Sequence, residues 1–210
     1  MNLLICARCG VHTDIPVVDT DEGEPVVRCT ECGHRQPFTR LPLYCLTGPS
    51  GTGKSTVARL LLPRLADRFV VLEQDVLWTA GLRDPAHNHR AFRSAWLRMA
   101  AMIHQSGRPV VLCGTVVPPE FELLPERPLF DGIHYLALVC EPTMLAERLR
   151  ARPAWREWDE PRIAEMLDYA AWVRETAADM APPVSLLDTT HTSVKETADD
   201  VCAWIERGGR

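Results

Sequence analysis

The sequence predicts an α/β protein in which helices cover both faces of a parallel sheet, preceded by a small metal-binding module. Two observations predict the sheet: a glycine-rich loop at 48–56 joins an apolar strand to an apolar helix, and short apolar strands alternate with helices from residue 41 onward. A third predicts the module, because two Cys-x-x-Cys-Gly motifs lie within the first 40 residues. We therefore expect two units, 1–40 and 41–210.

Length and composition are those of an ordinary globular chain. The 210 residues suffice for one sizeable core plus a small appendage, and 46% hydrophobic with 24% charged residues is a common proportion. A formal net charge of −5 gives no field that would attract nucleic acid or an anionic membrane. No window reaches eighteen apolar residues, and no basic segment with a long apolar run opens the chain, so we expect a cytoplasmic protein.

The cysteine motifs of the first unit are Cys6-Ala7-Arg8-Cys9-Gly10 and Cys29-Thr30-Glu31-Cys32-Gly33, with nineteen residues between Cys9 and Cys29. This spacing is typical of a structural Zn²⁺ site with four thiolate ligands, here Cys6, Cys9, Cys29 and Cys32. Disulfides or a redox-active pair are the alternatives. The unit is predicted to be a zinc-ribbon-like module with short strands near 17–18 and 24–28, in which the metal replaces a core too small to fold alone.

The charge of this ribbon bears on its partners. Four arginines against six acidic residues give −2 before the thiolates are counted. A ribbon that binds nucleic acid would be basic, so the charge favours a structural, dimerising or substrate-covering role, and it leaves a homodimer as one arrangement. The other four cysteines of the chain stand singly in apolar segments, as core residues do.

The loop at 48–56, Gly-Pro-Ser-Gly-Thr-Gly-Lys-Ser-Thr, fits the Walker A pattern of a phosphate loop, or P-loop, between a strand at 43–47 and an apolar helix. Its glycines let backbone N–H groups turn inward, and the helix that begins there directs its positive dipole end to the same point. Lys54 would reach the β- and γ-phosphates of a nucleotide, and the Ser55 hydroxyl would hold Mg²⁺. The nucleotide-binding residues would be Gly48, Ser50, Gly51, Thr52, Gly53, Lys54, Ser55 and Thr56.

The next strand, at 68–75, ends in two carboxylates, Glu73 and Asp75. Residues i and i+2 of a strand face the same side, and ligands gather at the carboxyl ends of parallel strands, so both should point to the loop. A third strand, at 109–115, ends without the acid with which motor and switch NTPases hold Mg²⁺, which leaves Glu73 and Asp75 as the candidates. A solvated strand end or a helix cap is the alternative.

A helix is expected from Asp84-Pro85 to about Gln105, with Asp as N-cap and Pro at the first helical position. Aromatic and cationic side chains gather at its start and just before it, among them Trp78, Arg83 and Arg93. Together they could line a pocket for a second substrate. For any one of them, surface exposure or core packing is the alternative.

The rest of the chain completes the alternation. A fourth strand at 133–140 leads into a helix from Pro142, and five arginines follow within 148–162. A proline breaks this helix, so the segment could be a lid that closes over phosphates, or only a solvated helix face. A helix at 159–178 and a last strand at 183–189 come next, and Ser193 with Glu196 forms a capping box that opens the terminal helix.

On these motifs, residues 41–210 resemble the small-molecule P-loop kinases, which include nucleoside, nucleotide, shikimate and gluconate kinases and chloramphenicol phosphotransferase. The resemblance is specific at the loop, 48–56, and looser elsewhere. It implies a five-stranded sheet of order 2-3-1-4-5, with ATP and Mg²⁺ as cofactors. It also implies in-line transfer of the γ-phosphoryl group from ATP to a small-molecule acceptor. The N-terminal zinc ribbon departs from the usual pattern of the family.

The resemblance further implies roles for single residues. Asp75 would orient and deprotonate the acceptor, and Glu73 would hold a magnesium-bound water. Thr115 falls where the third strand touches the acceptor. Lys54 and the lid arginines would neutralise developing charge; those that fall in the family's lid region are Arg148, Arg152 and Arg156.

Segments 69–78 and 150–158 most resemble bacterial nucleoside kinases of broad type, so a nucleoside or nucleotide is the expected acceptor. A sugar acid or an antibiotic hydroxyl is the alternative within the kinase class. Two other classes use the same loop, a nucleotide-gated ATPase and a nucleic-acid-associated protein that remodels its partner. The missing acid at the third strand argues against the first, and the acidic ribbon argues against the second.

Overall fold

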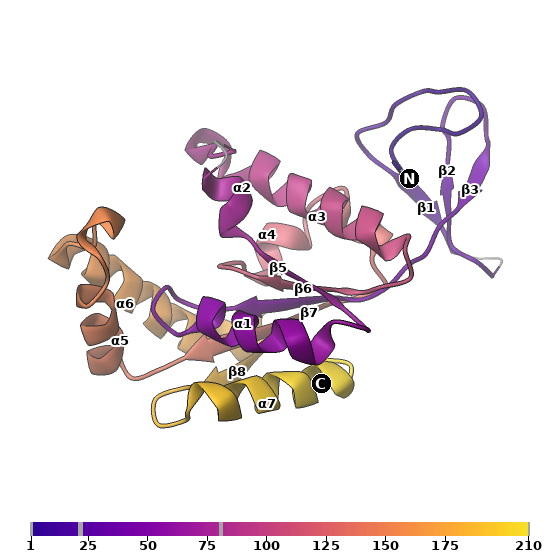
Figure 1. Cartoon of the computed structure of the whole chain (residues 1–210). Helices are drawn as coiled ribbons and strands as arrows, with labels where there is room; N and C mark the ends of the chain where they lie inside the picture. Colours follow the sequence, from indigo (N-terminus) through magenta and orange to yellow (C-terminus); the bar gives the residue numbers. More distant parts are fainter. Residues whose placement is uncertain (1, 21–22, 80–81, 210) are drawn as a thin grey trace.

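The computed structural model describes residues 2–20, 23–79 and 82–209 and contains two sheets (Figure 1). The first is antiparallel, with strand order β1-β2-β3, and belongs to the N-terminal ribbon. Its strands are short: β1 (Val17–Asp19), β2 (Val26–Arg28) and β3 (Arg35–Pro37). The first two coincide with the strands expected near 17–18 and 24–28.

The second sheet is parallel throughout, with strand order β5-β6-β4-β7-β8. Its strands are β4 (Leu43–Thr47), β5 (Val70–Glu73), β6 (Val110–Cys113), β7 (Ile133–Val139) and β8 (Val184–Asp188). Counted within this sheet, the order is 2-3-1-4-5, so the expected topology is confirmed. The central strand is β4, which leads directly into the glycine-rich loop.

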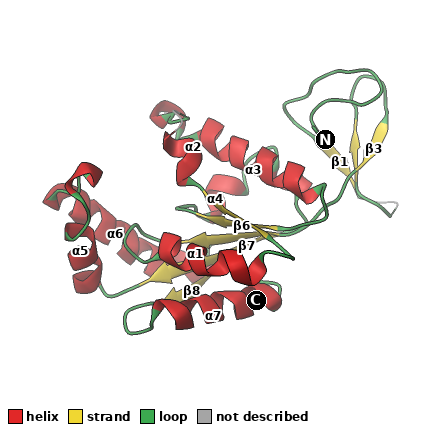
Figure 2. Ribbon diagram, in the orientation of Figure 1, coloured by secondary structure: helices red, strands yellow, loops and turns green. Residues whose placement is uncertain are grey.

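Helices cover both faces of this sheet (Figure 2). The α-helices are α1 (Lys54–Leu65), α2 (Asp75–Thr79), α3 (Arg90–His104), α4 (Pro118–Phe121), α5 (Pro142–Arg150), α6 (Glu160–Thr176) and α7 (Val194–Glu206). Short 3₁₀ turns lie at η1 (Pro85–His87), η2 (Arg127–Leu129), η3 (Ala154–Arg156) and η4 (Ala177–Asp179). The Ser193–Glu196 capping box is present, and Asp159 caps α6 by accepting a hydrogen bond from the Arg162 amide.

The side chains of β4 alternate between two cores. Leu43 and Cys45 belong to one cluster, which contains the buried residues of α3. Tyr44 and Leu46 belong to the other, which contains those of α1 and α7. Because both faces are buried, the strand is apolar from Leu43 to Leu46 rather than alternating between apolar and polar residues.

Two expected elements differ in the structure. Strand β5 ends at Glu73, so Asp75 is not on the strand but is the first residue of α2. The helix expected from Asp84 is interrupted, because Asn88 and His89 have left-handed backbone angles with φ of 51° and 55°, and a 3₁₀ turn precedes α3. Asp84 makes no side-chain cap.

The ribbon lies at the amino end of β4, and α5 and α6 lie at the opposite, carboxyl end of the sheet (Figure 1). This arrangement places the ribbon far from the glycine-rich loop, so it does not support a substrate-covering role for the ribbon. No helix in the described part of the chain is both long enough and apolar enough to cross a membrane.

Candidate active site

The glycine-rich loop follows β4 and needs glycine at positions where other residues would clash. Gly48 has φ of 118°, and a Cβ there would lie 2.3 Å from the carbonyl oxygen of Leu138 in β7. Gly51 has φ of 96°, and a Cβ there would lie 2.8 Å from Leu145 Cδ1 in α5. The loop is therefore wedged between the central sheet and the helix that leads to the expected lid.

Hydrogen bonds hold the loop in a closed curve. The Lys54 Nζ donates to the carbonyl oxygens of Gly48 at 2.6 Å and Pro49 at 2.8 Å. Thr52 is buried, and its hydroxyl donates to the Pro49 carbonyl at 2.9 Å. Burial lowers the pKa of Lys54 to about 8, although the nearby carboxylate of Asp75 opposes the shift. A buried cation held this way at the amino end of α1 suits a phosphate.

A cavity of about 290 Å³ opens beside the loop. It joins residues from four parts of the chain: the loop and α1, the end of β5 with α2, the end of β6, and the segment after α5. They are Ser50, Gly51, Gly53, Lys54, Ser55, Thr56, Glu73, Asp75, Cys113, Gly114, Thr115, Arg152, Pro153, Trp155 and Arg156. Six of the eight predicted loop residues are in this lining. The other two support the loop: Gly48 lies against the backbone of Leu138, and Thr52 bonds to the Pro49 carbonyl.

The two predicted carboxylates reach the cavity from different elements. Glu73 ends β5 and Asp75 begins α2, and both line the cavity. Between them, Gln74 is buried, and its side chain packs against the backbone of Gly114. The turn thus brings both carboxylates to the cavity that Lys54 and Ser55 also line, although not by the strand geometry on which the prediction rested.

The thiol of Cys113 also lines the cavity. Burial, together with the negative charge of Glu73, raises its pKa to about 12, so it is a neutral wall rather than a nucleophile.

The predicted lid arginines separate into two groups. Arg152 and Arg156 line the cavity, and burial followed by the charge of Arg156 lowers the pKa of Arg152. Arg148 is not among the described residues that line it, and instead donates to the Thr189 carbonyl at 3.3 Å, beside the end of β8. Two arginines of the segment after α5 therefore lie at the cavity, and Arg148 lies beside the end of the last strand.

The predicted acceptor residues are only partly brought together. Thr115 lines the cavity, whereas Trp78, Arg83 and Arg93 are outside the described lining. The Arg83 guanidinium lies 5.0 Å from the ring centre of Trp78, and Arg93 forms an ion pair with Glu120 of α4. Arg83 and Trp78 thus contact each other, and Arg93 contacts Glu120, outside the described lining of the cavity.

Sequence reasoning missed several lining residues, and Trp155 is the most informative. It is 72% exposed, and the Arg156 guanidinium lies 4.6 Å from its ring centre. An exposed indole beside a cavity is free to stack on a planar ligand. In the sequence, its place among the arginines after the proline break was the signal that could have found it.

Met166 of α6 was also missed. Its sulfur accepts a hydrogen bond from the Ser50 amide at 3.2 Å and so ties α6 to the loop.

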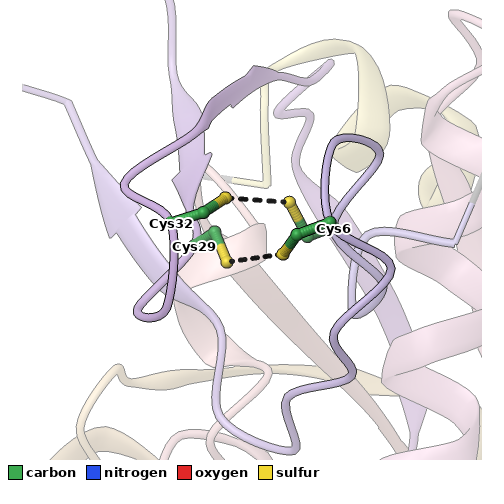
Figure 3. Close-up of side chains that lie close together, drawn as sticks. Cys6, Cys29 and Cys32 are labelled. Atoms are coloured by element: carbon green, nitrogen blue, oxygen red, sulfur yellow. Dashed lines mark hydrogen bonds between the residues drawn. The ribbon is translucent and has the colours of Figure 1, made fainter.

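The four cysteines of the ribbon form a second candidate site, which fits a zinc ion. Their sulfur atoms all lie within 4.8 Å of one another, and the pairs Cys6–Cys32 and Cys9–Cys29 are each 3.7 Å apart (Figure 3). A tetrahedron with Zn–S bonds of about 2.3 Å puts the sulfurs about 3.8 Å apart. All four cysteines are free of disulfides, and the Arg8 amide lies 3.4 Å from the Cys6 sulfur. The donor set and its size match a structural Zn²⁺ site.

The comparisons with known proteins agree with this fold and site. The sheet order, the phosphate loop and the cavity define the class of P-loop small-molecule kinase folds. A family model described as an AAA domain matches residues 45–168, more than half of the chain, and the chain therefore belongs to this family. No curated protein matches the sequence.

Two solved structures illustrate the likeness of fold. A shikimate kinase from Acinetobacter baumannii in complex with shikimate is 18% identical with a TM-score of 0.54, over 81% of this chain and 96% of that one. A gluconokinase from Sinorhizobium meliloti 1021 is 17% identical with a TM-score of 0.51, over 82% of this chain and 94% of that one. At these identities the likeness concerns the fold.

Proposed function

We propose that this chain is an ATP- and Mg²⁺-dependent phosphotransferase that moves the γ-phosphoryl group to a small-molecule acceptor, a nucleoside or nucleotide. The observation that carries the proposal is the single cavity in which Lys54, Ser55, the carboxylates Glu73 and Asp75, and the lid arginines meet. A phosphate loop opposite a carboxylate and arginine side chains suits phosphoryl transfer, because catalysis there is positioning and charge neutralisation.

In this proposal each residue has one task. Asp75 accepts the proton of the acceptor hydroxyl while the acceptor oxygen bonds to the γ-phosphorus. The bond from the γ-phosphorus to the bridging oxygen of the β-phosphate breaks, which releases ADP. Ser55 would bind Mg²⁺ directly and Glu73 through a water, and the ion would neutralise the β- and γ-phosphates. Lys54, Arg152 and Arg156 stabilise charge on the transferred group, and closure of the segment around 148–162 excludes water.

The acceptor is proposed from the aromatic surface at the cavity. Trp155 is exposed there, whereas Trp78 packs edge-on against His89 at 4.6 Å and Phe92 at 5.3 Å between ring centres, outside the described lining. Aromatic surface of this kind suits a base. Arg93 is paired with Glu120, so it does not offer a free cation for the carboxylate of a sugar acid.

We also propose that 1–40 and 41–210 are the two domains, and that the protein works in the cytoplasm, where thiolates stay reduced.

The test is a screen for acceptor-dependent transfer. The purified protein is incubated with ATP and Mg²⁺ and with nucleosides, nucleotides, sugars, sugar acids, aminoglycosides or phenicol-type compounds, and products are identified by mass spectrometry. We expect a phosphorylated nucleoside or nucleotide. ADP release that is equal with every compound and without any would instead identify an ATPase, and a phosphorylated sugar acid would contradict the acceptor class.

The low pKa of Lys54 predicts that ATP binding takes up a proton. In the free protein the amine loses its proton as the pH rises through about 8. Bound phosphates favour the charged form and raise this pKa, so the complex holds more protons than the free protein. ATP affinity should therefore be full below pH 8 and decline above it. Calorimetry at pH 8 in two buffers of different ionisation enthalpy should show the uptake in the parent and none in Lys54→Met; identical heats in both buffers for the parent would contradict the assignment.

A further inference from the structure

The ribbon packs onto the kinase domain through the carboxyl-terminal half of α3. Leu3, Val27 and Phe38 of the N-terminal module are buried in the same cluster as the apolar face of α3. The α3 members of that cluster are Phe92, Trp96, Leu97, Ala100 and Ala101. This cluster also holds residues of β4, β6, β7 and η2, so the ribbon joins the core on this face of the sheet rather than hanging from a free linker. Its contact with α3 itself is a cavity that Leu3 lines together with Arg98, Ala101 and Met102.

A side-chain amide at the end of α3 fixes the chain that leaves the ribbon. The Gln105 Oε1 accepts from the Thr39 amide at 2.9 Å, and its Nε2 donates to the Thr39 carbonyl at 3.0 Å. The same Nε2 also donates to the Ala101 carbonyl within α3 at 2.9 Å. One side chain thus satisfies both backbone groups of Thr39, which sets the position and orientation of this segment against the helix.

A charged network joins the ribbon, α3 and the segment after α4. Arg98 of α3 donates through Nε to the Glu126 Oε1 at 2.7 Å, and its Nη2 lies 3.8 Å from the Asp14 carboxylate of the ribbon. Ser94, one turn earlier on α3, donates to the same Glu126 oxygen at 2.5 Å. Glu126 is fully buried, so losing Arg98 would leave a buried carboxylate with little compensation.

The other half of α3 supports both segments that leave the acceptor end of the cavity. Phe92 packs on Trp78 of α2, the helix that begins with Asp75. Arg93 pairs with Glu120 of α4, the helix that follows Thr115. The nucleotide side of the cavity is built differently, since α1 packs with α7 on the opposite face of the sheet. A shift of α3 would therefore move the acceptor side more than the phosphate loop.

We propose that the zinc-loaded ribbon is a brace for α3, and that through α3 it sets the affinity for the acceptor without acting on the nucleotide. Gln105 and Arg98 are the positioning residues that transmit this effect. The proposal rests on the proposed function in one respect, since it takes the end of the cavity near Asp75 and Thr115 as the acceptor side.

The first experiment removes the metal from the full chain. The zinc content is measured, and the zinc is then extracted with a chelator while the cysteines are kept reduced, and later restored. Hydrogen exchange of the α3 amides is followed by mass spectrometry in each state. We expect about one zinc per chain, exchange in α3 that is about tenfold faster without it, and recovery on adding Zn²⁺. ATP affinity, measured by calorimetry with Mg²⁺, should stay within about twofold, because the loop contacts lie elsewhere. Unchanged exchange in α3, or equal loss of ATP binding, would overturn the brace.

The second experiment keeps the zinc ligands. Gln105→Glu retains the shape of the side chain but replaces its donor with a charge that faces the Thr39 carbonyl. Glu31→Gln, an exposed change on the second cysteine motif, is the matched control. With zinc content equal in both, Gln105→Glu should speed α3 exchange and raise the KM for the acceptor about tenfold with kcat nearly unchanged, while the control matches the parent.

The two readouts separate this inference from the proposed function. Exchange and ATP affinity are measured without any acceptor, so they decide whether the ribbon braces α3 even if no acceptor is found. If Gln105→Glu left α3 exchange at the parental level, the brace would be wrong. Faster exchange with an unchanged acceptor KM would also overturn the claim that the ribbon sets acceptor affinity.

Discussion

Lys54→Ala is expected to abolish phosphoryl transfer while the fold stays intact. The Lys54 amine already lies on the inner side of the loop, 2.6 Å from the Gly48 carbonyl, and it lines the cavity in which the phosphates would bind. Loss of one preorganised charge contact in such a site typically lowers the rate by about a hundredfold or more. Initial rates of product formation, with circular dichroism as the check on folding, measure the effect.

The composition of the chain offers a matched control for this change. The chain has only two lysines, and the second, Lys195, is exposed on α7. Lys195→Ala should transfer phosphate at the parental rate. Arginine should not rescue position 54, because its broad planar group cannot replace a compact ammonium inside the loop. Near-parental activity of Lys54→Ala would mean that the loop is only a structural turn.

The fold could be predicted because its signals are local. The run 43–47 is apolar, β-branched or aromatic for most of its length, and it stands next to a glycine-rich loop that fits the Walker A pattern. The cysteine motifs define a metal site by spacing alone, and the four sulfurs meet as predicted. The capping box at Ser193 is equally local, since Ser193 accepts a hydrogen bond from the amide of Glu196, three residues on.

The parts that could not be predicted depend on partners far away in the sequence. Arg93 resembled a free cation in the sequence, yet its partner Glu120 comes from another helix. The arginines of the lid segment are alike in sequence, and only the fold shows that Arg152 and Arg156 reach the cavity while Arg148 meets Thr189. The break before α3 had a weak local signal, because asparagine adopts left-handed angles more readily than most residues.

The position of Asp75 gives the prediction that separates a phosphotransferase from an ATPase. Asp75 starts α2, on the side of the cavity that leads to Trp78, whereas Glu73 ends β5 next to Cys113. A carboxylate that completes the magnesium shell should, when neutralised, weaken metal and nucleotide binding together. A carboxylate that takes the acceptor proton should instead leave nucleotide binding almost unchanged and slow the chemical step.

Asp75→Asn is therefore expected to bind ATP and Mg²⁺ within a few-fold of the parent, yet to lose acceptor-dependent transfer by about 10²–10⁴ in rate. Glu73→Gln is the matched variant and should show a defect that added Mg²⁺ relieves. Calorimetry of nucleotide binding, beside mass spectrometry of the product at several Mg²⁺ concentrations, distinguishes the two. If Asp75→Asn transferred phosphate normally to a confirmed acceptor, or if Mg²⁺ rescued its whole defect, Asp75 would not be the base, and the proton would have to leave through Glu73 or the substrate's own phosphates.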